Sequence, residues 1–343
     1  MRILGIETSC DDTSVAIYDQ KIGLVFHSTL NQNKVHAEFS GIVPELAARS
    51  HLNQLIFLIK KIFSQHFTDK NFITKKNIFD AIAYTIGPGF SGSLLVGSTI
   101  ALSLSLSLNI PSISVNHLEG HLLSVMLNHT NNIFPFLALL VSGANTQLIS
   151  SHKFGQYTIL GETLDDSVGN VFDYIAKLLG LGYPGGKKLS DLAKHGQSGK
   201  YFFPRPMTKY SNLNFSFSGL KTHVKNIILN NPNLLQERFN IAKSFEEAIV
   251  DTLVVKCKLA IQKTNLKNLL VCGGVSSNHL LRKKLKNLVE SNQGKCFFPK
   301  KIFCTDNAAM IAYVGFLKYN SNIYSCHNSI RVFPDLLIND KID

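Results

Sequence analysis

The chain has no tryptophan and, among its six cysteines, no C-x-x-C pair. Zinc ribbons and the disulfide frameworks of secreted proteins depend on closely spaced cysteines, so the sequence argues against both. The opening stretch MRILGIETSCDDT reaches acidic residues at once and lacks the apolar core of a signal peptide. We therefore expect reduced thiols and a cytoplasmic location.

A phosphate-binding P-loop is missing as well. It requires G-x-x-x-x-G-K-[ST], because its lysine neutralises phosphate charge. The glycine-rich stretch from Gly87 to Ser93 has no lysine, and YPGGKKLS, around Gly185 and Gly186, has lysines at the wrong spacing. We therefore expect neither a P-loop nor a dinucleotide-binding Rossmann fold.

Formal charge is absent between Ala81 and Leu118. By composition this segment could be scored as a membrane span. Its serines, its glycine-rich beginning and Pro111 are more typical of a buried helix followed by a short buried strand. The expectation is therefore an α/β core and no membrane association.

Acidic residues number 23 against 35 lysines and arginines, which gives a formal net charge of +12. Such an excess favours a polyanionic partner, nucleic acid first, although a lysine-rich composition can also be background. For any single basic run a solvated helix face is the alternative explanation. The candidate phosphate contacts are Lys60–Lys61, Lys221, Lys225, Leu280–Lys286 and Lys300–Lys301.

A repeated plan runs through the 343 residues, a length that favours two lobes. RILGIETSCDDTSVAIYD and FLALLVSGANTQLISS both read as strand, polar turn and strand. NLLVCGGVSSNHLLRKKL reads as a strand, two glycines and a helix capped by Ser276 or Ser277. Helical stretches lie between these elements, so we expect an α/β, duplicated two-lobed fold with an interlobe cleft.

The stretch NHLEGHLLS places His117 and His121 four residues apart, on one face of a helix. A metalloprotease would carry H-E-x-x-H, but here Leu118 follows the first histidine and Glu119 should point elsewhere. A third ligand must come from a distant carboxylate, and Asp306 in FCTDNAAMIAYVG is the best candidate. Thr305 or Asp306 is expected to cap the helix there, but spacing alone does not join it to the histidines.

Main-chain N–H groups in serine- and glycine-rich turns can bind an anion without a lysine. Two such turns, with the Gly-Gly strand end of CGGVSSN leaving room for a base and ribose, favour a nucleotide site. Two ordinary hairpins remain the alternative.

The ordered set GIETSCDDT, NHLEGH, LLVSGANTQL, GETLDDSVGNVFDYIAKLLGLGYPGG, FSFSGLKT, CGGVSSN and CTDNAAMIAY resembles the bacterial tRNA N6-adenosine threonylcarbamoyltransferase family, from Ile3 to Gly315. The resemblance implies a fold of the actin, heat-shock-ATPase and sugar-kinase type. It implies transfer of a threonylcarbamoyl group from threonylcarbamoyl-adenylate to N6 of adenosine 37, in tRNAs reading codons that begin with A. Lobe I would comprise residues 1–115 plus about 307–335, lobe II residues 116–306, and 336–343 a tail.

The resemblance also implies site residues and partners. One divalent metal, iron rather than zinc, would be bound by His117, His121 and Asp306. An inactive paralogue of the same fold and a P-loop ATPase would act as helper subunits. The implied substrate contacts are Leu140, Val141, Ser142, Gly143, Ala144, Asp173, Gly186 and Asn278.

Several positions depart from the family pattern: Ala144 and Asn145 replace Gly and His, Asp12 replaces Glu, and Asn170 and Lys187 are also unusual. If its turn requires positive φ, Ala144 would be strained. Asp11 is the candidate for steering the attacking amine or accepting its proton, with Asp12 or solvent as alternatives.

Two other classes of function stay open from the residues alone. A small-molecule kinase or ATPase of the same fold shares the turns but has no need of the histidine pair. A non-enzymatic RNA-binding or assembly subunit would show no turnover of the adenylate. A peptidase ranks last, for want of a well-placed glutamate.

Overall fold

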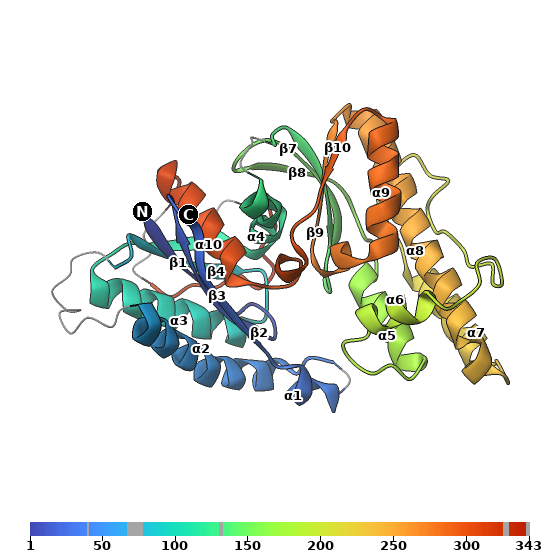
Figure 1. The fold of residues 1–343 in the computed structure, drawn as a ribbon, viewed down its shortest axis with the longest axis horizontal. Helices are drawn as coiled ribbons and strands as arrows, with labels where there is room; N and C mark the ends of the chain where they lie inside the picture. Colours follow the sequence, from blue (N-terminus) through green and yellow to red (C-terminus); the bar gives the residue numbers. More distant parts are fainter. Residues whose placement is uncertain (40, 67–77, 130–132, 325–328, 341–343) are drawn as a thin grey trace. The chain divides into compact units, whose positions relative to one another are not determined.

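The computed structural model describes residues 1–39, 41–66, 78–129, 133–324 and 329–340. The chain divides into two compact units. Unit 1 is Met1–Thr130 with Asp306–Asp343, and unit 2 is Asn131–Thr305. Each unit has one five-stranded mixed sheet with helices packed on it (Figure 1).

The two sheets have the same topology. In each, a three-stranded antiparallel meander is extended by two parallel strands on the side of its first strand. Unit 1 has the order β3-β2-β1-β4-β5, with β1 (Arg2–Glu7), β2 (Asp12–Asp19), β3 (Gly23–Asn31), β4 (Ala81–Gly87) and β5 (Ser112–Asn116). Unit 2 has the order β8-β7-β6-β9-β10, with β6 (Phe136–Val141), β7 (Thr146–Lys153), β8 (Gln156–Glu162), β9 (Asn268–Cys272) and β10 (Lys295–Phe297). The predicted duplication is therefore confirmed.

Helices cover both faces of the unit 1 sheet because alternate β1 residues are apolar on each side. Leu4 and Ile6 pack in one core with residues of α2 and α3, whereas a Cβ on Gly5 would lie 2.5 Å from the carbonyl oxygen of Ala308. Gly5 therefore lets α10 approach β1 closely. The helices of this unit are α1 (Asn33–Ala37), α2 (Pro44–His66), α3 (Ser91–Leu108), α4 (His117–Leu123), the 3₁₀ turn η1 (Ser124–Asn128) and α10 (Ala308–Asn320).

The core of unit 2 lies between its sheet and α5, α7, α8 and α9. Glycines follow the end of α5, where Gly180 and Gly182 have φ of +76° and +72°. The helices are α5 (Val168–Leu178), α6 (Gly186–Ala193), α7 (Ser218–Leu229), α8 (Leu234–Thr264) and α9 (His279–Ser291), with short 3₁₀ turns η2 (Gly274–Ser277) and η3 (Lys301–Phe303).

By length and composition α3 is the one helix in the described part of the chain that could cross a membrane. It packs against α2, β1, β4 and β5, and Ser93, Ser98 and Ser105 lie on its buried side. The Ser105 hydroxyl donates to the carbonyl of Ile110, 2.5 Å away. One side of α3 is therefore packed within unit 1, while Leu95 and Leu106 are 43% and 79% exposed.

Two predicted helix caps are wrong. Asn278, rather than Ser276 or Ser277, caps α9 by accepting from the Leu281 N–H at 2.8 Å, because both serines are taken up by η2. Asn307, rather than Thr305 or Asp306, caps α10 by accepting from the Met310 N–H at 3.0 Å. Asp306 therefore lies outside the helix, where its side chain is not committed to capping.

The division into units also differs from the expected lobes. Residues 116–130 and Asp306 belong to unit 1, because α4 packs directly on α10. Gly120 permits this packing because it has no Cβ, and a Cβ there would lie only 3.0 Å from Ile311 Cδ1. The expected tail joins unit 1 as well, since Leu336 is buried and the Asn116 side chain donates to the Leu337 carbonyl at 2.9 Å.

Candidate metal centre and nucleotide site

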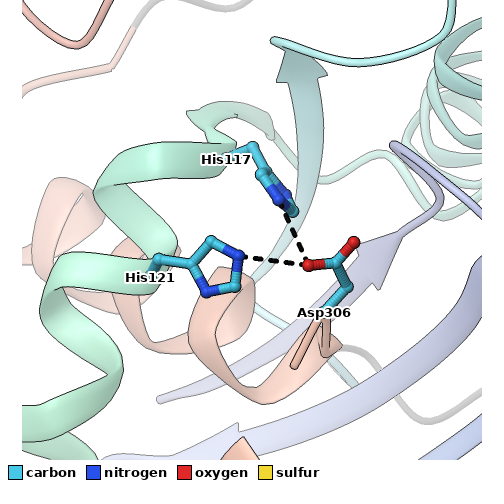
Figure 2. A group of neighbouring side chains, drawn as sticks. All are labelled: His117, His121 and Asp306. Carbon is cyan, nitrogen blue, oxygen red and sulfur yellow. Dashed lines mark hydrogen bonds and ion pairs between the residues drawn. The ribbon is translucent and has the colours of Figure 1, made fainter. Parts of the chain in front are cut away.

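The histidine pair lies on α4, which begins directly after β5. Asn116 caps this helix, accepting from the Leu118 N–H at 2.8 Å, so that His117 is its first residue. The rings of His117 and His121 lie edge to face, with centroids 4.7 Å apart and an interplanar angle of 80° (Figure 2). The prediction that both imidazoles share one helix face is confirmed.

Asp306 points at both rings from the segment before α10 (Figure 2). Its Oδ1 lies 3.4 Å from His117 Nε2 and 3.1 Å from His121 Nε2. The ligand atoms of the three residues all lie within 4.8 Å of one another. Donors bound tetrahedrally at about 2.1 Å from a metal ion are about 3.4 Å apart, which matches the distances from Asp306 Oδ1 to the two imidazole nitrogens.

Negative charge favours a cation at this cluster, whose His117 and His121 are only 8% and 1% exposed. Burial raises the pKa of Asp306, but the adjacent His117 and His121 outweigh it and hold that pKa far below its usual range. Burial lowers the pKa of His117, and the charges of Glu7 and Asp306 more than reverse this. In the metal-free protein a proton therefore takes the place of a cation, and metal binding should release it.

Glu7 is a member of this environment that the sequence did not reveal. Its Oε2 lies 3.0 Å from His117 Nδ1 and accepts from the Thr85 hydroxyl at 2.5 Å, while Oε1 accepts from the Ser9 N–H at 2.5 Å. The side chain is fully buried at the end of β1. The only signal in the sequence was a carboxylate ending an apolar strand.

Glu119, which a peptidase would need as a general base, points away from the cluster as predicted. Its Oε2 lies 3.2 Å from Lys318 Nζ on α10, and its side chain is buried. The pair ties α4 to α10, so Glu119 serves packing and does not face the histidines.

Two further carboxylates lie where β1 turns into β2. Burial, followed by the charge of Asp306, raises the pKa of Asp11. Burial, followed by the charges of Asp306, Asp11 and Glu7, raises the pKa of Asp12 to about 8. Both groups therefore feel the negative charge of the cluster, and a raised pKa suits a proton acceptor.

The raised pKa of Asp12 predicts a pH dependence of stability in the metal-free protein. The folded chain holds a proton on Asp12 that the unfolded chain releases at lower pH, so stability should fall as pH rises from about 4 to about 8 and level off above that. In the presence of a chelator, Asp12→Asn should flatten the decline in Tm between about pH 4 and pH 8. An equally steep decline in the variant would contradict this assignment.

The expected substrate contacts all lie in unit 2, beyond the carboxyl ends of β6 and β9, where open α/β sheets bind ligands. Leu140 and Val141 end β6 and are buried, so only their main chain is available. A Cβ on Gly169, at the start of α5, would lie 2.4 Å from the Ser142 carbonyl oxygen. The turn after β6 therefore packs on the first turn of α5.

From α5 the contacts continue to α6 and α9 and return to β6. Asp173 Oδ1 accepts from the N–H groups of Gly185 and Gly186 at 2.8 and 3.0 Å. One helical turn later, Ser190 accepts from the Asn278 amide at 2.9 Å. The loop before Asn278 returns to β6, because a Cβ on Gly273 would lie 2.4 Å from the Val141 carbonyl oxygen. These contacts link the elements that carry the eight expected residues, here called the unit 2 ring: Leu140, Val141, Ser142, Gly143, Ala144, Asp173, Gly186 and Asn278.

Ala144 is not strained. The described non-glycine residues with positive φ do not include Ala144, and Gly143 is not among the positive-φ glycines either. The turn is closed instead by Ser142, whose N–H donates to the Asn145 carbonyl at 2.9 Å and whose hydroxyl accepts from the Asn145 N–H at 3.0 Å. The backbone strain that was expected at Ala144 if its turn required positive φ is therefore absent.

Some basic side chains that were expected to contact phosphate form contacts within the fold instead. Lys221 pairs with Asp166 at 3.0 Å and lies over the Tyr174 ring. In the Leu280–Lys286 run, Lys284 pairs with Asp251 at 2.5 Å and Arg282 donates to the Ser276 carbonyl at 2.6 Å. Lys283 and Lys286 of this run are exposed, so half of its charge faces solvent.

The chain is similar to proteins of known function. A family model described as tRNA N6-adenosine threonylcarbamoyltransferase (TsaD) matches residues 23–313. A Buchnera aphidicola subsp. Cinara cedri (strain Cc) protein named tRNA N6-adenosine threonylcarbamoyltransferase is 70% identical, covering 100% of this chain and 99% of its own length.

Solved structures share the fold at low identity. T. kodakarensis HypF aligns with a TM-score of 0.64 at 15% identity, over 95% of this chain and 48% of HypF, so the chain spans about half of that protein. The Acidaminococcus fermentans (R)-2-hydroxyglutaryl-CoA dehydratase component A aligns with a TM-score of 0.52 at 14% identity, over 93% and 99%. The expected α/β fold of the actin and heat-shock-ATPase type is confirmed.

Proposed function

The chain belongs to the tRNA N6-adenosine threonylcarbamoyltransferase family, and from that premise we propose its reaction and the residues that perform it. The chain transfers the threonylcarbamoyl group of threonylcarbamoyl-adenylate to N6 of adenosine 37, in tRNAs reading codons that begin with A. The convergence of His117, His121 and Asp306 is the observation that carries the proposal. A kinase of the same fold would have no use for this cluster.

The cluster is proposed to hold one divalent metal, Fe²⁺ in preference to Zn²⁺. Two histidines and one carboxylate form the donor set that commonly binds non-haem Fe²⁺ with coordination positions left open. When bound, the ion supplies Lewis-acid polarisation and a template for substrate oxygens. Asp306 contributes the one anionic ligand, and the two neutral imidazoles complete the set.

Proton transfer is assigned to the acids of the first turn. As the adenosine N6 attacks the carbamoyl carbon, the bond from that carbon to the AMP phosphate oxygen breaks and the N6 proton must leave. Asp11 is proposed to accept this proton, since its pKa is raised, and Asp12, whose pKa is about 8, is the next candidate in its ionised form. AMP is a good leaving group, so positioning can supply most of the acceleration without a covalent intermediate.

The unit 2 ring is proposed to bind the adenylate. Asp173 uses Oδ1 to hold Gly185 and Gly186, which leaves Oδ2 for ribose hydroxyls, since no described residue donates to it. In the Ser142–Ala144 turn, Gly143 and Ala144 can offer N–H groups to the phosphate or carbonyl, since the Ser142 N–H is taken up by the Asn145 carbonyl. Asn278 is proposed to position the site, because its side-chain amide is already hydrogen-bonded. Its oxygen accepts from the Leu281 N–H, and its nitrogen donates to Ser190 and Glu246.

Gly186 and Gly185 give a matched pair for testing this assignment. A Cβ on Gly186 would meet only ordinary contacts, with Phe172 Cβ at 3.7 Å and Asp173 Oδ1 at 3.8 Å, whereas one on Gly185 would lie 2.2 Å from Ala176 Cβ. Gly186→Ala should therefore keep the wild-type Tm but weaken adenylate-analogue binding about 10-fold or more, as calorimetry would measure. Gly185→Ala should lower the Tm, and unchanged binding in Gly186→Ala would remove Gly186 from the site.

The proposed partners follow the family. The tRNA would meet basic side chains, Lys283 and Lys286 among them, through its phosphates. An inactive paralogue of the same fold and a P-loop ATPase are the proposed helper subunits, and the proposed location is the cytoplasm.

The function is tested by reconstitution. The purified chain, loaded with Fe²⁺ or Zn²⁺ and combined with the helper subunits, threonylcarbamoyl-adenylate and unmodified tRNA, should form one threonylcarbamoyl-adenosine per tRNA. Mass spectrometry of the digested tRNA measures the product. A tRNA with another base at position 37 should remain unmodified. Modification of that control tRNA, or no modification of the tRNA with adenosine 37, would contradict the proposal.

A further inference from the structure

We propose that Glu7 is a positioning residue for the metal centre. It accepts a hydrogen bond from His117 Nδ1 and thereby leaves His117 Nε2 to bind the ion. This inference rests on the metal centre proposed above and deepens it, because it assigns a role to a carboxylate that does not itself touch the ion.

The position of Glu7 is fixed by the fold. It ends β1, the central strand of its sheet, which pairs with β2 and β4 on its two sides. Its carboxylate accepts from the Ser9 N–H and the Thr85 hydroxyl, each at 2.5 Å, so neither oxygen can turn away. With 0% exposure, the group has no solvent to compete for its lone pairs.

These contacts determine which nitrogen of His117 is protonated. An ionised Glu7 carboxylate only accepts hydrogen bonds, so across 3.0 Å it accepts from His117 Nδ1, and the Ser9 hydroxyl is the second neighbour of this nitrogen, at 3.1 Å. His117 Nε2 is then the atom that faces Asp306, at 3.4 Å. Carboxylates commonly orient metal-binding histidines in this manner.

The second histidine has no such partner. His121 Nδ1 is buried, and no described residue forms a hydrogen bond with it. His121 is therefore held by helix packing and by its Nε2 contact with Asp306. Within the described residues, Glu7 is thus the one carboxylate that contacts an Nδ1 atom of the histidine pair.

The test uses Glu7→Gln, with Zn²⁺ and Fe²⁺ as probes and a competing chelator to measure Kd. The neutral amide keeps the shape of Glu7 but weakens the hold on the Nδ1 proton, so metal affinity should fall about 10- to 100-fold. Glu119→Gln is the matched control, because it also neutralises a buried carboxylate of unit 1 but one paired with Lys318. The control should lose some thermal stability and keep the wild-type Kd.

A spectroscopic readout on the wild-type chain does not depend on any variant folding. In the Zn²⁺-loaded protein labelled with ¹⁵N-histidine, His117 Nδ1 should carry a proton and Nε2 should show the shift of a metal-bound nitrogen. Metal bound through His117 Nδ1 would overturn the inference. So would a folded Glu7→Gln variant with the wild-type Kd, and either result would leave the metal centre itself standing. A wild-type chain that binds neither ion would overturn the proposed centre and this inference together.

Discussion

Asp306→Asn should reduce the transfer rate at least about 100-fold and abolish stoichiometric metal binding. That factor corresponds to about 2.7 kcal/mol of transition-state stabilisation. The substitution keeps the shape of the side chain but replaces its carboxylate with a neutral amide. Asp306 Oδ1 is the atom that both imidazoles face, at 3.4 and 3.1 Å, so the cluster loses its only anionic ligand.

The measurement combines metal content after dialysis with single-turnover transfer to tRNA at saturating adenylate. Asn307→Ser is the control, since Asn307 neighbours Asp306 and caps α10. Serine is also a good cap, so this variant should stay within about threefold of the wild type in both assays. Full transfer by metal-free Asp306→Asn would show that the cluster has no metal role in the reaction.

Local patterns predicted the parts of the fold that depend on neighbouring residues. Alternating apolar strands, polar turns and helical periodicity run through both halves, and they recur as two sheets of the same topology. The spacing of His117 and His121 alone predicted a shared helix face. Glu119 is one residue away from the place a peptidase would need, and its ion pair with Lys318 confirms the predicted orientation.

Features that depend on distant residues were not predictable in this manner. Glu7 and His117 are 110 residues apart, so no spacing rule joins them. The caps of α9 and α10 were misassigned because several serine, threonine, asparagine and aspartate residues compete within a few positions, and the end of the preceding segment decides between them. Lys221 was predicted to contact tRNA phosphate because its actual partner, Asp166, is 55 residues away in sequence and no local pattern joins the two.

The two glycines that follow β9 give the second large effect. Gly273 has φ +86° and ψ 167°, a region essentially confined to glycine, and a Cβ there would lie 2.4 Å from the Val141 carbonyl oxygen. On Gly274 the nearest atom to a Cβ would be Thr305 Cγ2, at 4.0 Å. The two positions are adjacent in sequence, but only the first is closed to a side chain.

Gly273→Ala should therefore cost about 2 kcal/mol or more in stability, and it should push the end of β6 and its turn out of place. A displacement of about 1 Å is enough to lower transfer about 100-fold, because binding geometry sets the approach of the reacting atoms. Metal binding should persist, since all three ligands belong to unit 1 and Gly273 to unit 2. Gly274→Ala should match the wild type in adenylate affinity, metal content and transfer. If Gly273→Ala binds the adenylate analogue as tightly as Gly274→Ala does, then the ends of β6 and β9 do not form the nucleotide site, and the ring of contacts around them is only packing.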